Sequence, residues 1–179
     1  MKADEAEQFR EFVQARWARL VRTAYLLTGD HGEAEDVVQL ALTKVYVAWH
    51  WVQGSDNPDA YVRRILVNTN AGRFRRKRVI RLLGVTPPEQ RTAADSTTRQ
   101  VEQRDALVRA LAKLPARQRA VVVLRYWDDL PQADVARALG LSFGAVKSQA
   151  SKGLAKLRAD PGLHGAVWGA DDGAEVIAV

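Results

Sequence analysis

The chain has 179 residues, and 47% of them are hydrophobic, which is enough for one large packed domain or two small ones. It has no cysteine, so disulfides, thiol catalysis and thiolate metal sites are excluded, as is usual in a reducing cytoplasm. Its net charge of +6 favours a polyanionic partner, and without a signal-peptide pattern or a long apolar run we expect a soluble, cytoplasmic protein with no membrane insertion.

Three helices are predicted in the first half of the chain. Apolar side chains recur at helical spacing over residues 9–27, and Thr28–Asp30 interrupts the pattern. Asp30 and Glu33 have the spacing of a capping box, so a second helix is expected to begin there and to run to about Trp49. Its inward face is expected to consist of Val37, Val38, Ala41, Leu42, Val45 and Ala48.

The third helix follows a polar loop at 52–57. Asn57 can cap a helix whose first residue is Pro58, and the helix is expected to run to about Lys77. It is strongly basic, because no acid interrupts its cations and those just beyond its end, which are Arg63, Arg64, Arg73, Arg75, Arg76, Lys77, Arg78 and Arg81. Such a helix should bind phosphates by releasing counterions, whereas a merely solvated helix end explains only one or two cations.

Aromatic and amide groups adjoin this basic helix. Trp49, Trp51, Tyr61 and Phe74 lie close to it in sequence, and the loop Gly54–Asn57 is polar. Unstacked bases need a stacking partner and hydrogen bonds to their exposed edges, and these residue types supply both. Trp49 continues the apolar face of its helix, so the core is favoured for it, while Tyr61 and Phe74 are open between core and base contact.

The second half predicts a separate, four-helix domain. Periodicity is lost over 79–100, which contains Pro87-Pro88 and a Ser/Thr cluster and is interpreted as a flexible linker, with extension of the preceding helix over 79–83 as the alternative for its first residues. Apolar spacing resumes with Val101, and Leu114-Pro115 restarts a helix. After Arg158 there is no Lys or Arg, and a loosely ordered acidic tail is expected. The fold class is therefore all-α, with domains at residues 1–78 and 101–158, the linker at 79–100 and the tail at 159–179.

Residues 130–157 have the pattern of a helix-turn-helix. Gly140 stands where the chain must turn, and Ser142 can cap a second helix. Small and apolar residues are expected on the inner side of the two helices, namely Ala133, Val135, Ala136, Leu139, Val146, Ala150, Leu154 and Leu157. Lys147, Ser148, Ser151 and Lys152 fall on the opposite face, where they can meet phosphates or base edges in the major groove. The alternative is an ordinary helical hairpin with a solvated basic face.

Taken together and in this order, these segments resemble an extracytoplasmic-function (ECF) RNA polymerase sigma factor of the sigma-70 family, of the kind called the SigE family in high-GC Gram-positive bacteria. The resemblance covers roughly residues 5–158. It depends on the segments Ala34–Gln39, Leu114–Arg119 and Gly144–Gln149. It implies two domains, one like sigma2 and one like sigma4, that bind core RNA polymerase and direct promoter-specific initiation.

The resemblance also implies roles for individual residues. Contact with the clamp helices of the polymerase largest subunit is implied for Glu35, Asp36, Gln39, Leu40 and Thr43. Recognition and melting of the −10 element, held as single-stranded DNA, is implied for Gly54, Ser55, Asp56, Asn57, Tyr61, Arg63, Arg64, Asn68, Asn70 and Arg73. Recognition of the double-stranded −35 element is implied for Arg117, Ser142, Phe143, Lys147, Ser148, Ser151 and Lys152. The polymerase beta flap and, for many members, an anti-sigma factor are further implied partners, and no cofactor or metal is.

Four departures from the family pattern stand out. Pro131 stands where a serine or threonine often caps the first helix of the helix-turn-helix. Leu40 occupies a place where the family usually has an acid, and Ala145 replaces a common threonine. Gly153 lies inside the predicted recognition helix, where it should cost roughly 1 kcal/mol relative to alanine.

Two other functions were weighed. A stand-alone helix-turn-helix repressor would explain the second half but would leave the basic third helix and the segment Ala34–Gln39 without a role. An enzyme is disfavoured, because Asp128-Asp129 sits at a predicted turn, the three histidines have no metal-ligand spacing, and no glycine-rich phosphate loop is present. For the tail we considered docking on the basic third helix, and a protease tag at 176–179.

Overall fold

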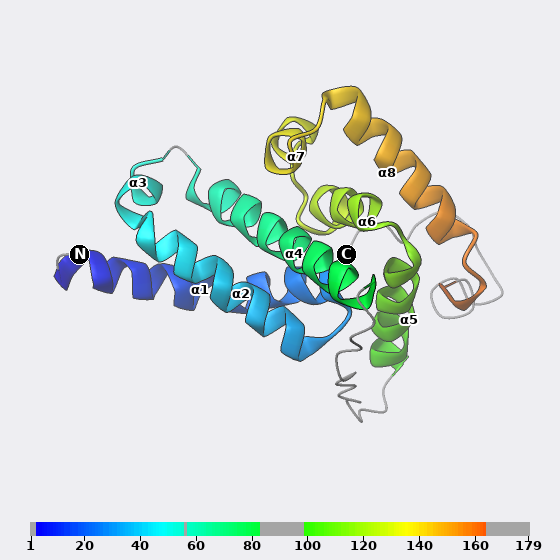
Figure 1. The fold of residues 1–179 in the computed structure, drawn as a ribbon, viewed down its shortest axis with the longest axis horizontal. Helices are drawn as coiled ribbons and strands as arrows, with labels where there is room; N and C mark the ends of the chain where they lie inside the picture. Colours follow the sequence, from blue (N-terminus) through cyan, green and yellow to red (C-terminus); the bar gives the residue numbers. More distant parts are fainter. Residues whose placement is uncertain (1–2, 56, 83–98, 164–179) are drawn as a thin grey trace. The chain divides into compact units, whose positions relative to one another are not determined.

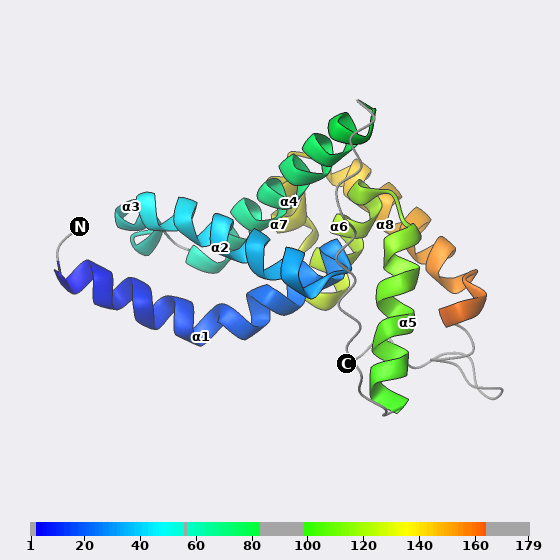
Figure 2. The same cartoon turned by 60° about the horizontal axis from the view of Figure 1, so that its bottom comes forward.

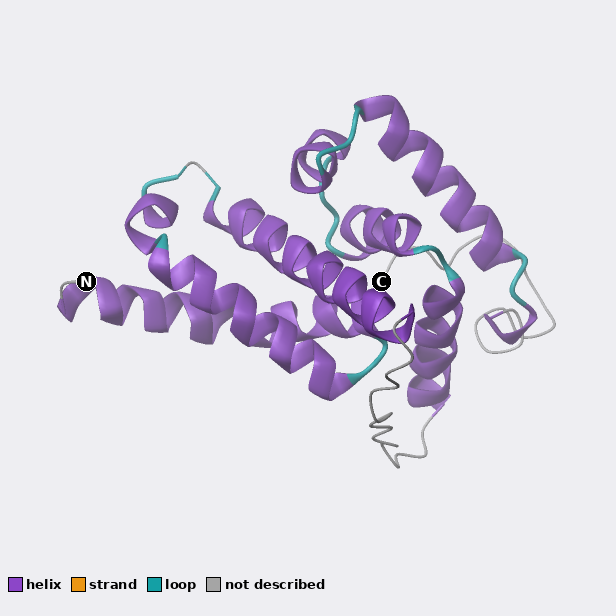
Figure 3. Cartoon of the chain, in the orientation of Figure 1, coloured by secondary structure: helices purple, strands orange, loops and turns teal. Residues whose placement is uncertain are grey.

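The computed structural model describes residues 3–55, 57–82 and 99–163. Within them every regular element is a helix, so the all-α fold predicted from the sequence is confirmed (Figure 3). The chain divides into two compact units. The first contains α1 (Ala3–Thr28), α2 (His31–Val47), α3 (Trp49–Gln53) and α4 (Pro58–Leu82). The second contains α5 (Arg99–Lys113), α6 (Ala116–Val122), the π-helical turn η1 (Val123–Trp127) and α8 (Phe143–Arg158), with α7 (Gln132–Leu139) leading into α8.

In the first unit α1, α2 and α4 pack side by side, as Figures 1 and 2 both show. Their core is apolar, and α2 supplies half of its buried residues: Ala34, Val37, Val38, Ala41, Leu42 and Val45. These positions recur every three or four residues, so they form one stripe of the helix and fix its rotation. Five of the six residues predicted to face inward are buried, whereas the sixth, Ala48, is half-buried. Ala34 is buried as well and was not predicted.

The predicted helix starts of the first unit are confirmed by their caps. The Asp30 carboxylate accepts a hydrogen bond of 2.8 Å from the Glu33 amide, and the Asn57 side-chain oxygen accepts one of 2.9 Å from the Ala60 amide. The second helix ends at Val47, close to the predicted end near Trp49. The short α3 that follows includes Val52 and Gln53, which were expected to be loop, and Val52 is buried in the core.

The start of α4 is tied to α1 by an ion pair. The Arg16 guanidinium donates to both carboxylate oxygens of Asp59, and it also stacks 4.0 Å over the Phe12 ring. Burial by itself would raise the pKa of Asp59, but the hydrogen bond and charge of Arg16, helped by Arg63 and Arg19, lower the pKa below its ordinary value. The polar loop at 54–57 therefore enters a helix whose first turn is anchored.

The third helix is longer than predicted and enters the expected linker. α4 extends to Leu82 rather than to Lys77, and α5 begins at Arg99, so both ends of the segment 79–100 are helical. The remainder of the predicted linker, 83–98, lies outside the described residues.

A buried arginine joins α5 to α6 in the second unit. Arg119 lies on the inward side of α6, where its Nη2 donates to the carbonyl oxygens of Ala112 at 2.8 Å and Leu114 at 3.3 Å. These carbonyls belong to the C-terminal turn of α5 and the residue after it, which have no intrahelical donors. Burial lowers the pKa of Arg119 from its ordinary value. A guanidinium nevertheless remains charged in proteins.

The helix-turn-helix is formed as the sequence predicted. Gly140 adopts φ +62°, the Leu141 amide donates to the Ala136 carbonyl, and Ser142 caps α8 by accepting from the Ala145 amide at 3.2 Å. The inner sides include buried Val135, Val146, Ala150 and Leu157. Ala133 is exposed, contrary to expectation, because α7 buries Val135 and Ala138 instead.

The acidic tail begins later than expected. Asp160 and Leu163 are buried, and the Asp160 carboxylate pairs with Lys113 of α5 at 2.7 Å. Loose order from Ala159 onward was therefore wrong for 159–163. The remainder of the tail, 164–179, on which both tail hypotheses depend, lies outside the described residues.

Close packing explains Gly153. A Cβ at this position would lie 2.7 Å from Val122 Cγ2 on α6, too near for a stiff β-branched side chain to accommodate. We expect Gly153→Ala to destabilise the protein by about 1–2 kcal/mol, because steric strain exceeds the gain in helix propensity. Gly144→Ala on the same helix is the control, since no atom lies within 4 Å of its added Cβ, and it should be neutral or stabilising. Urea denaturation followed by circular dichroism measures both, and equal stabilisation by the two substitutions would contradict the packing argument.

The Arg16–Asp59 pair should make stability depend on pH. Because the pKa of Asp59 is lowered in the folded state, the pair stabilises the fold above the ordinary aspartate pKa, and this stabilisation is lost as the pH falls through the lowered pKa. Solvent screening limits the effect to about 0.5 kcal/mol. Asp59→Asn should therefore lower the free energy of unfolding at pH 7, and its deficit should shrink below about pH 4. Glu11→Gln, on an exposed position of α1, is the control. A deficit that stays constant down to pH 2 would argue against the ion pair.

Candidate functional site

The outer face of α2 presents one continuous set of side chains. Because the inward stripe is fixed by the core, the remaining positions point to solvent, and all five residues of the predicted polymerase-binding set are exposed there: Glu35, Asp36, Gln39, Leu40 and Thr43. Leu40, at 49% exposure, is the one apolar member of this set. The structure therefore brings these five residues onto one face.

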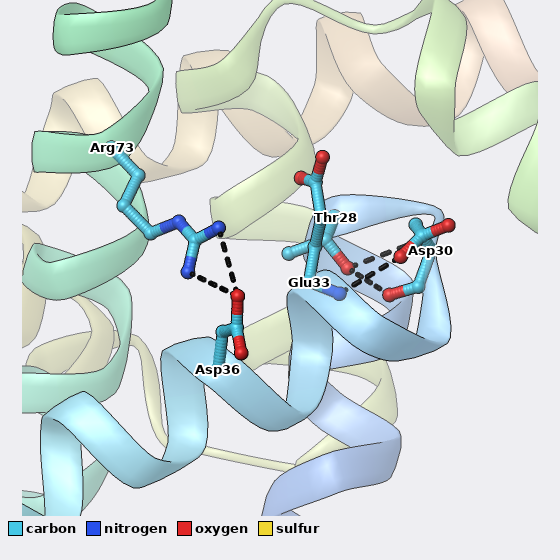
Figure 4. A network of polar contacts seen from close by, with 5 residues as sticks. All are labelled: Thr28, Asp30, Glu33, Asp36 and Arg73. Carbon is cyan, nitrogen blue, oxygen red and sulfur yellow. Dashed lines mark hydrogen bonds and ion pairs between the residues drawn. The ribbon is translucent and has the colours of Figure 1, made fainter. Parts of the chain in front are cut away.

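Two polar contacts cross the seam between α2 and α4. The Asp36 carboxylate accepts from Nη1 and Nη2 of Arg73 at 3.4 and 3.5 Å, and Figure 4 shows the two side chains pointing toward each other. Lys44 Nζ donates to Thr69 Oγ1 at 2.9 Å. Arg73 belongs to the predicted promoter-binding set and Asp36 to the predicted polymerase-binding set, so the two sets meet at this seam.

The outer face of α4 carries only part of the predicted promoter-binding set. Tyr61, Arg64 and Asn68 are exposed and lie on one side of the helix, at spacings of three and four. Arg63 and Asn70 do not join them, since they are only 7% and 8% exposed. They are seven residues apart and share the opposite stripe, which faces the other helices. The inclusion of Arg63 and Asn70 among surface contacts is corrected accordingly.

The polar loop between α3 and α4 is held at both ends. Ser55 Oγ donates to the Val52 carbonyl at 2.7 Å, and Asn57 is the N-cap of α4. Gly54 and Asn57 are exposed, while Asp56 lies outside the described residues. The loop therefore projects from anchored ends, and this suits a contact that requires a defined position.

The aromatic residues separate into core and surface. Trp49 is buried against Phe9 and Phe12 with ring centroids 5.2 and 5.0 Å apart, which confirms the core interpretation favoured for it. Trp51 is 79% exposed, with only the edge of His50 against its ring. The sequence analysis named Trp51 among the aromatic residues beside the basic helix but did not include it in the predicted −10 set. The side chains of Phe74 and of the cations beyond Arg73 lie outside the described residues.

The outer face of α8 presents the predicted −35 set. Phe143, Lys147, Ser148, Ser151 and Lys152 are all exposed, and Phe143 is 59% exposed although it is a large apolar side chain. The Gln132 amide donates to the Phe143 carbonyl at 2.8 Å, which fixes the start of α8 against α7. Ser142 is exposed but serves as the N-cap, and Arg117 is exposed in the first turn of α6. An exposed, cationic first half of α8 has the form of a DNA recognition helix.

A groove of about 300 Å³ lies beside α8 in the second unit. Its apolar lining comes from Tyr126, Val146, Ala150 and Leu154, and its polar lining from Arg125, Gln132, Lys147, Ser151 and Arg158. η1 forms one side of the groove through Arg125 and Tyr126. The described residues contain no cluster of three or more His, Cys, Asp or Glu that could hold a metal ion.

Two known protein-family models match separate parts of the chain. Residues 12–79 match the family model described as "Sigma-70 region 2", and residues 104–157 match "Sigma-70, region 4". The first range includes α2, α3 and most of α4. The second includes α6, η1, α7 and all of α8 except its last residue.

Similar proteins are found over most of the chain. It is 36% identical over 156 residues to the RNA polymerase sigma-E factor of Streptomyces coelicolor, a match that covers 86% of each chain. It is 33% identical over 162 residues to the ECF RNA polymerase sigma factor SigM of Mycobacterium tuberculosis, covering 87% of this chain and 78% of that protein. Among solved structures, the fold resembles the sigma factor RpoE of Bartonella quintana, crystallised with the anti-sigma factor NepR, with a TM-score of 0.69, 24% identity and coverage of 86% and 96%.

Proposed function

Since this chain belongs to the ECF sigma factors of the sigma-70 family, which direct transcription initiation by RNA polymerase, we propose that separate outward helix faces carry its separate contacts. The observation that carries the proposal is that core packing leaves α2, α4 and α8 each with one exposed face of distinct chemistry. The domain assignment is residues 1–78 as the sigma2-like domain and 101–158 as the sigma4-like domain. Bond formation belongs to the polymerase.

The outer face of α2 is the proposed contact for the polymerase clamp helices. It offers two carboxylates, an amide and a hydroxyl around Leu40. An exposed apolar residue surrounded by polar groups has the composition of an interface centre with a polar rim. Leu40 stands where the family usually has an acid, so in this chain the contact is proposed to be more apolar.

The outer face of α4, the loop 54–57 and Trp51 are the proposed −10 surface. Opening a promoter unstacks bases at a cost of a few kcal/mol per step. Exposed Trp51 and Tyr61 offer aromatic planes on which bases can stack, and Arg64 and Asn68 offer a phosphate contact and hydrogen bonds to bases. The anchored loop is proposed to receive a flipped base.

The outer face of α8 is the proposed −35 surface, and the groove beside it is proposed to take the polymerase beta flap. Lys147 and Lys152 suit phosphates, and Ser148, Ser151 and Phe143 suit base edges in the major groove. The groove has the apolar lining that a protein segment requires, with cations at its edge. Lys147 and Ser151 line the groove and also belong to the DNA face, so both partners would meet along one side of α8.

Two weak DNA contacts become effective when polymerase fixes their separation, because the second contact then forms at a high effective concentration. We therefore propose that the isolated chain has little promoter affinity, that it acts with polymerase on the nucleoid in the cytoplasm, and that an anti-sigma factor restrains it by covering the same faces. A stand-alone repressor is not favoured.

The direct experiment is transcription by purified core polymerase on a library of upstream sequences, with and without this chain. Initiation that depends on the chain and selects paired −10 and −35 motifs is expected, and operator binding without polymerase would argue for the repressor.

Lys147→Ala is expected to weaken holoenzyme binding to a promoter selected in that experiment about 10-fold. The loss of one phosphate contact should also reduce the slope of log affinity against log salt by about 1. Arg109→Ala is the matched control, because Arg109 is an exposed cation on α5 outside every proposed surface. Gel-shift titration at several salt concentrations measures both, and equal losses for the two variants would show that only overall charge matters.

Trp51→Ala is expected to slow open-complex formation about 10-fold, because base stacking on an aromatic side chain contributes about 1–3 kcal/mol. Holoenzyme binding to the closed, double-stranded promoter should change little. Permanganate reactivity of melted thymines against time measures opening. A premelted template restores the activity of Trp51→Ala if stacking drives melting, whereas a defect that persists on the premelted template would assign Trp51 to another step. Since Trp51 is 79% exposed, the substitution leaves the core intact.

A further inference from the structure

One ion pair links the α2 face proposed for polymerase to Arg73, a residue of the predicted promoter-binding set whose side chain lies between α2 and α4. Asp36 lies on the α2 face proposed for polymerase, and Arg73 lies on the helix proposed for DNA. Their side chains meet at 3.4 and 3.5 Å through both terminal nitrogens of the guanidinium (Figure 4). Pairing with a carboxylate partly neutralises the guanidinium and engages its two terminal nitrogens, so Arg73 attracts a phosphate less strongly while Asp36 holds it.

The two partners differ in accessibility. The Asp36 side chain is 62% exposed, while the Arg73 side chain is 26% exposed and lies in the seam. A protein bound to the outer face of α2 can therefore reach Asp36 directly. The seam itself does not depend on this pair, because Lys44 bonds Thr69 and the buried stripe of α2 fixes the helices. Asp36 can change partner without any helix moving.

We propose that the Asp36–Arg73 pair couples polymerase binding to DNA binding in this chain, a proposal that rests on the surfaces assigned above. In the free chain Asp36 holds Arg73 and lowers its availability to DNA phosphates. When polymerase engages the α2 face it takes Asp36 as a ligand, and Arg73 is released to the promoter strand. The coupling is reciprocal by thermodynamic necessity, so a DNA phosphate that takes Arg73 also frees Asp36 for polymerase.

The size of the coupling follows from the exposure of the pair. Partly exposed ion pairs contribute up to about 1 kcal/mol, which corresponds to a factor of about 5 in an equilibrium constant. An effect of about 2–5-fold is therefore expected, and it should diminish as salt rises. A coupling of this size adjusts DNA affinity rather than switching it fully.

The test measures binding of the free full-length chain to a fluorescent single-stranded A/T-rich DNA 20-mer at low salt. Asp36→Asn should raise affinity about 2–5-fold in the wild-type background and not beyond the general charge effect in the Arg73→Gln background. Glu35→Gln reports that general effect, because Glu35 is the neighbouring exposed acid on the same helix. Circular dichroism checks that all variants are folded. An equal gain from Asp36→Asn with and without Arg73, or one no larger than that of Glu35→Gln, would overturn the coupling.

A second measurement distinguishes failure of the coupling from failure of the proposed −10 surface. Holoenzyme carrying Arg73→Gln should open a selected promoter more slowly than wild type. If opening is unchanged, Arg73 is not part of the −10 surface, and the surface assignment and the coupling both fail. If opening slows but the DNA-binding measurements on the free chain show no interaction between Asp36→Asn and Arg73→Gln, Arg73 remains part of the −10 surface and only the coupling is refuted.

Discussion

The burial of one stripe of α2 between α1 and α4 is the constraint on which the first unit depends. Six small or branched side chains occupy that stripe and none of them is more than 7% exposed. A rotation of the helix by one residue would place Asp36 where Val37 lies and would bury a carboxylate without a partner, at a cost of several kcal/mol. The rotation is thus fixed, and with it the outward direction of every residue proposed to meet polymerase.

In the second unit, close helix packing and a buried arginine determine which face of α8 points outward. Its α6 and α8 approach so closely that Gly153 has no room for a Cβ, and the connection before α6 is held by a buried guanidinium. Burying the charge of Arg119 is costly, and so is leaving the carbonyl groups at the end of α5 without hydrogen bonds. The hydrogen bonds from Arg119 to these carbonyls offset both costs. The glycine that weakens α8 as an isolated helix therefore allows the close packing that directs its cationic face outward.

Local features of the sequence were sufficient to predict the helices and their caps. They were insufficient to predict which face of α4 turns toward the core. Asp30, Asn57, Ser142 and Gly140 act within a few residues of themselves, and each was predicted correctly. The exposure of Arg63 depends instead on which stripe of α4 meets α1 and α2, and no spacing within α4 alone determines that. The basic character of the helix drew Arg63 into the predicted DNA face. Trp51 was named among the aromatic residues beside the basic helix but was left out of the predicted −10 set, and the break between α2 and α3 at Ala48 was not predicted.

A net charge of +6 poses a problem for a protein that must find promoters. Cations bind any duplex by counterion release, and a genome offers a vast excess of non-specific sites. A chain whose DNA faces were fully available would be sequestered before it met polymerase. Dividing the DNA contacts between two units keeps each one weak, because neither gains from the other until polymerase fixes their separation. The proposed coupling acts in the same direction, because Asp36 pairs with Arg73 in the free chain. Weak DNA binding by the free chain is thus what the proposed role requires, and the proposed coupling of Asp36 to Arg73 contributes one small part of it.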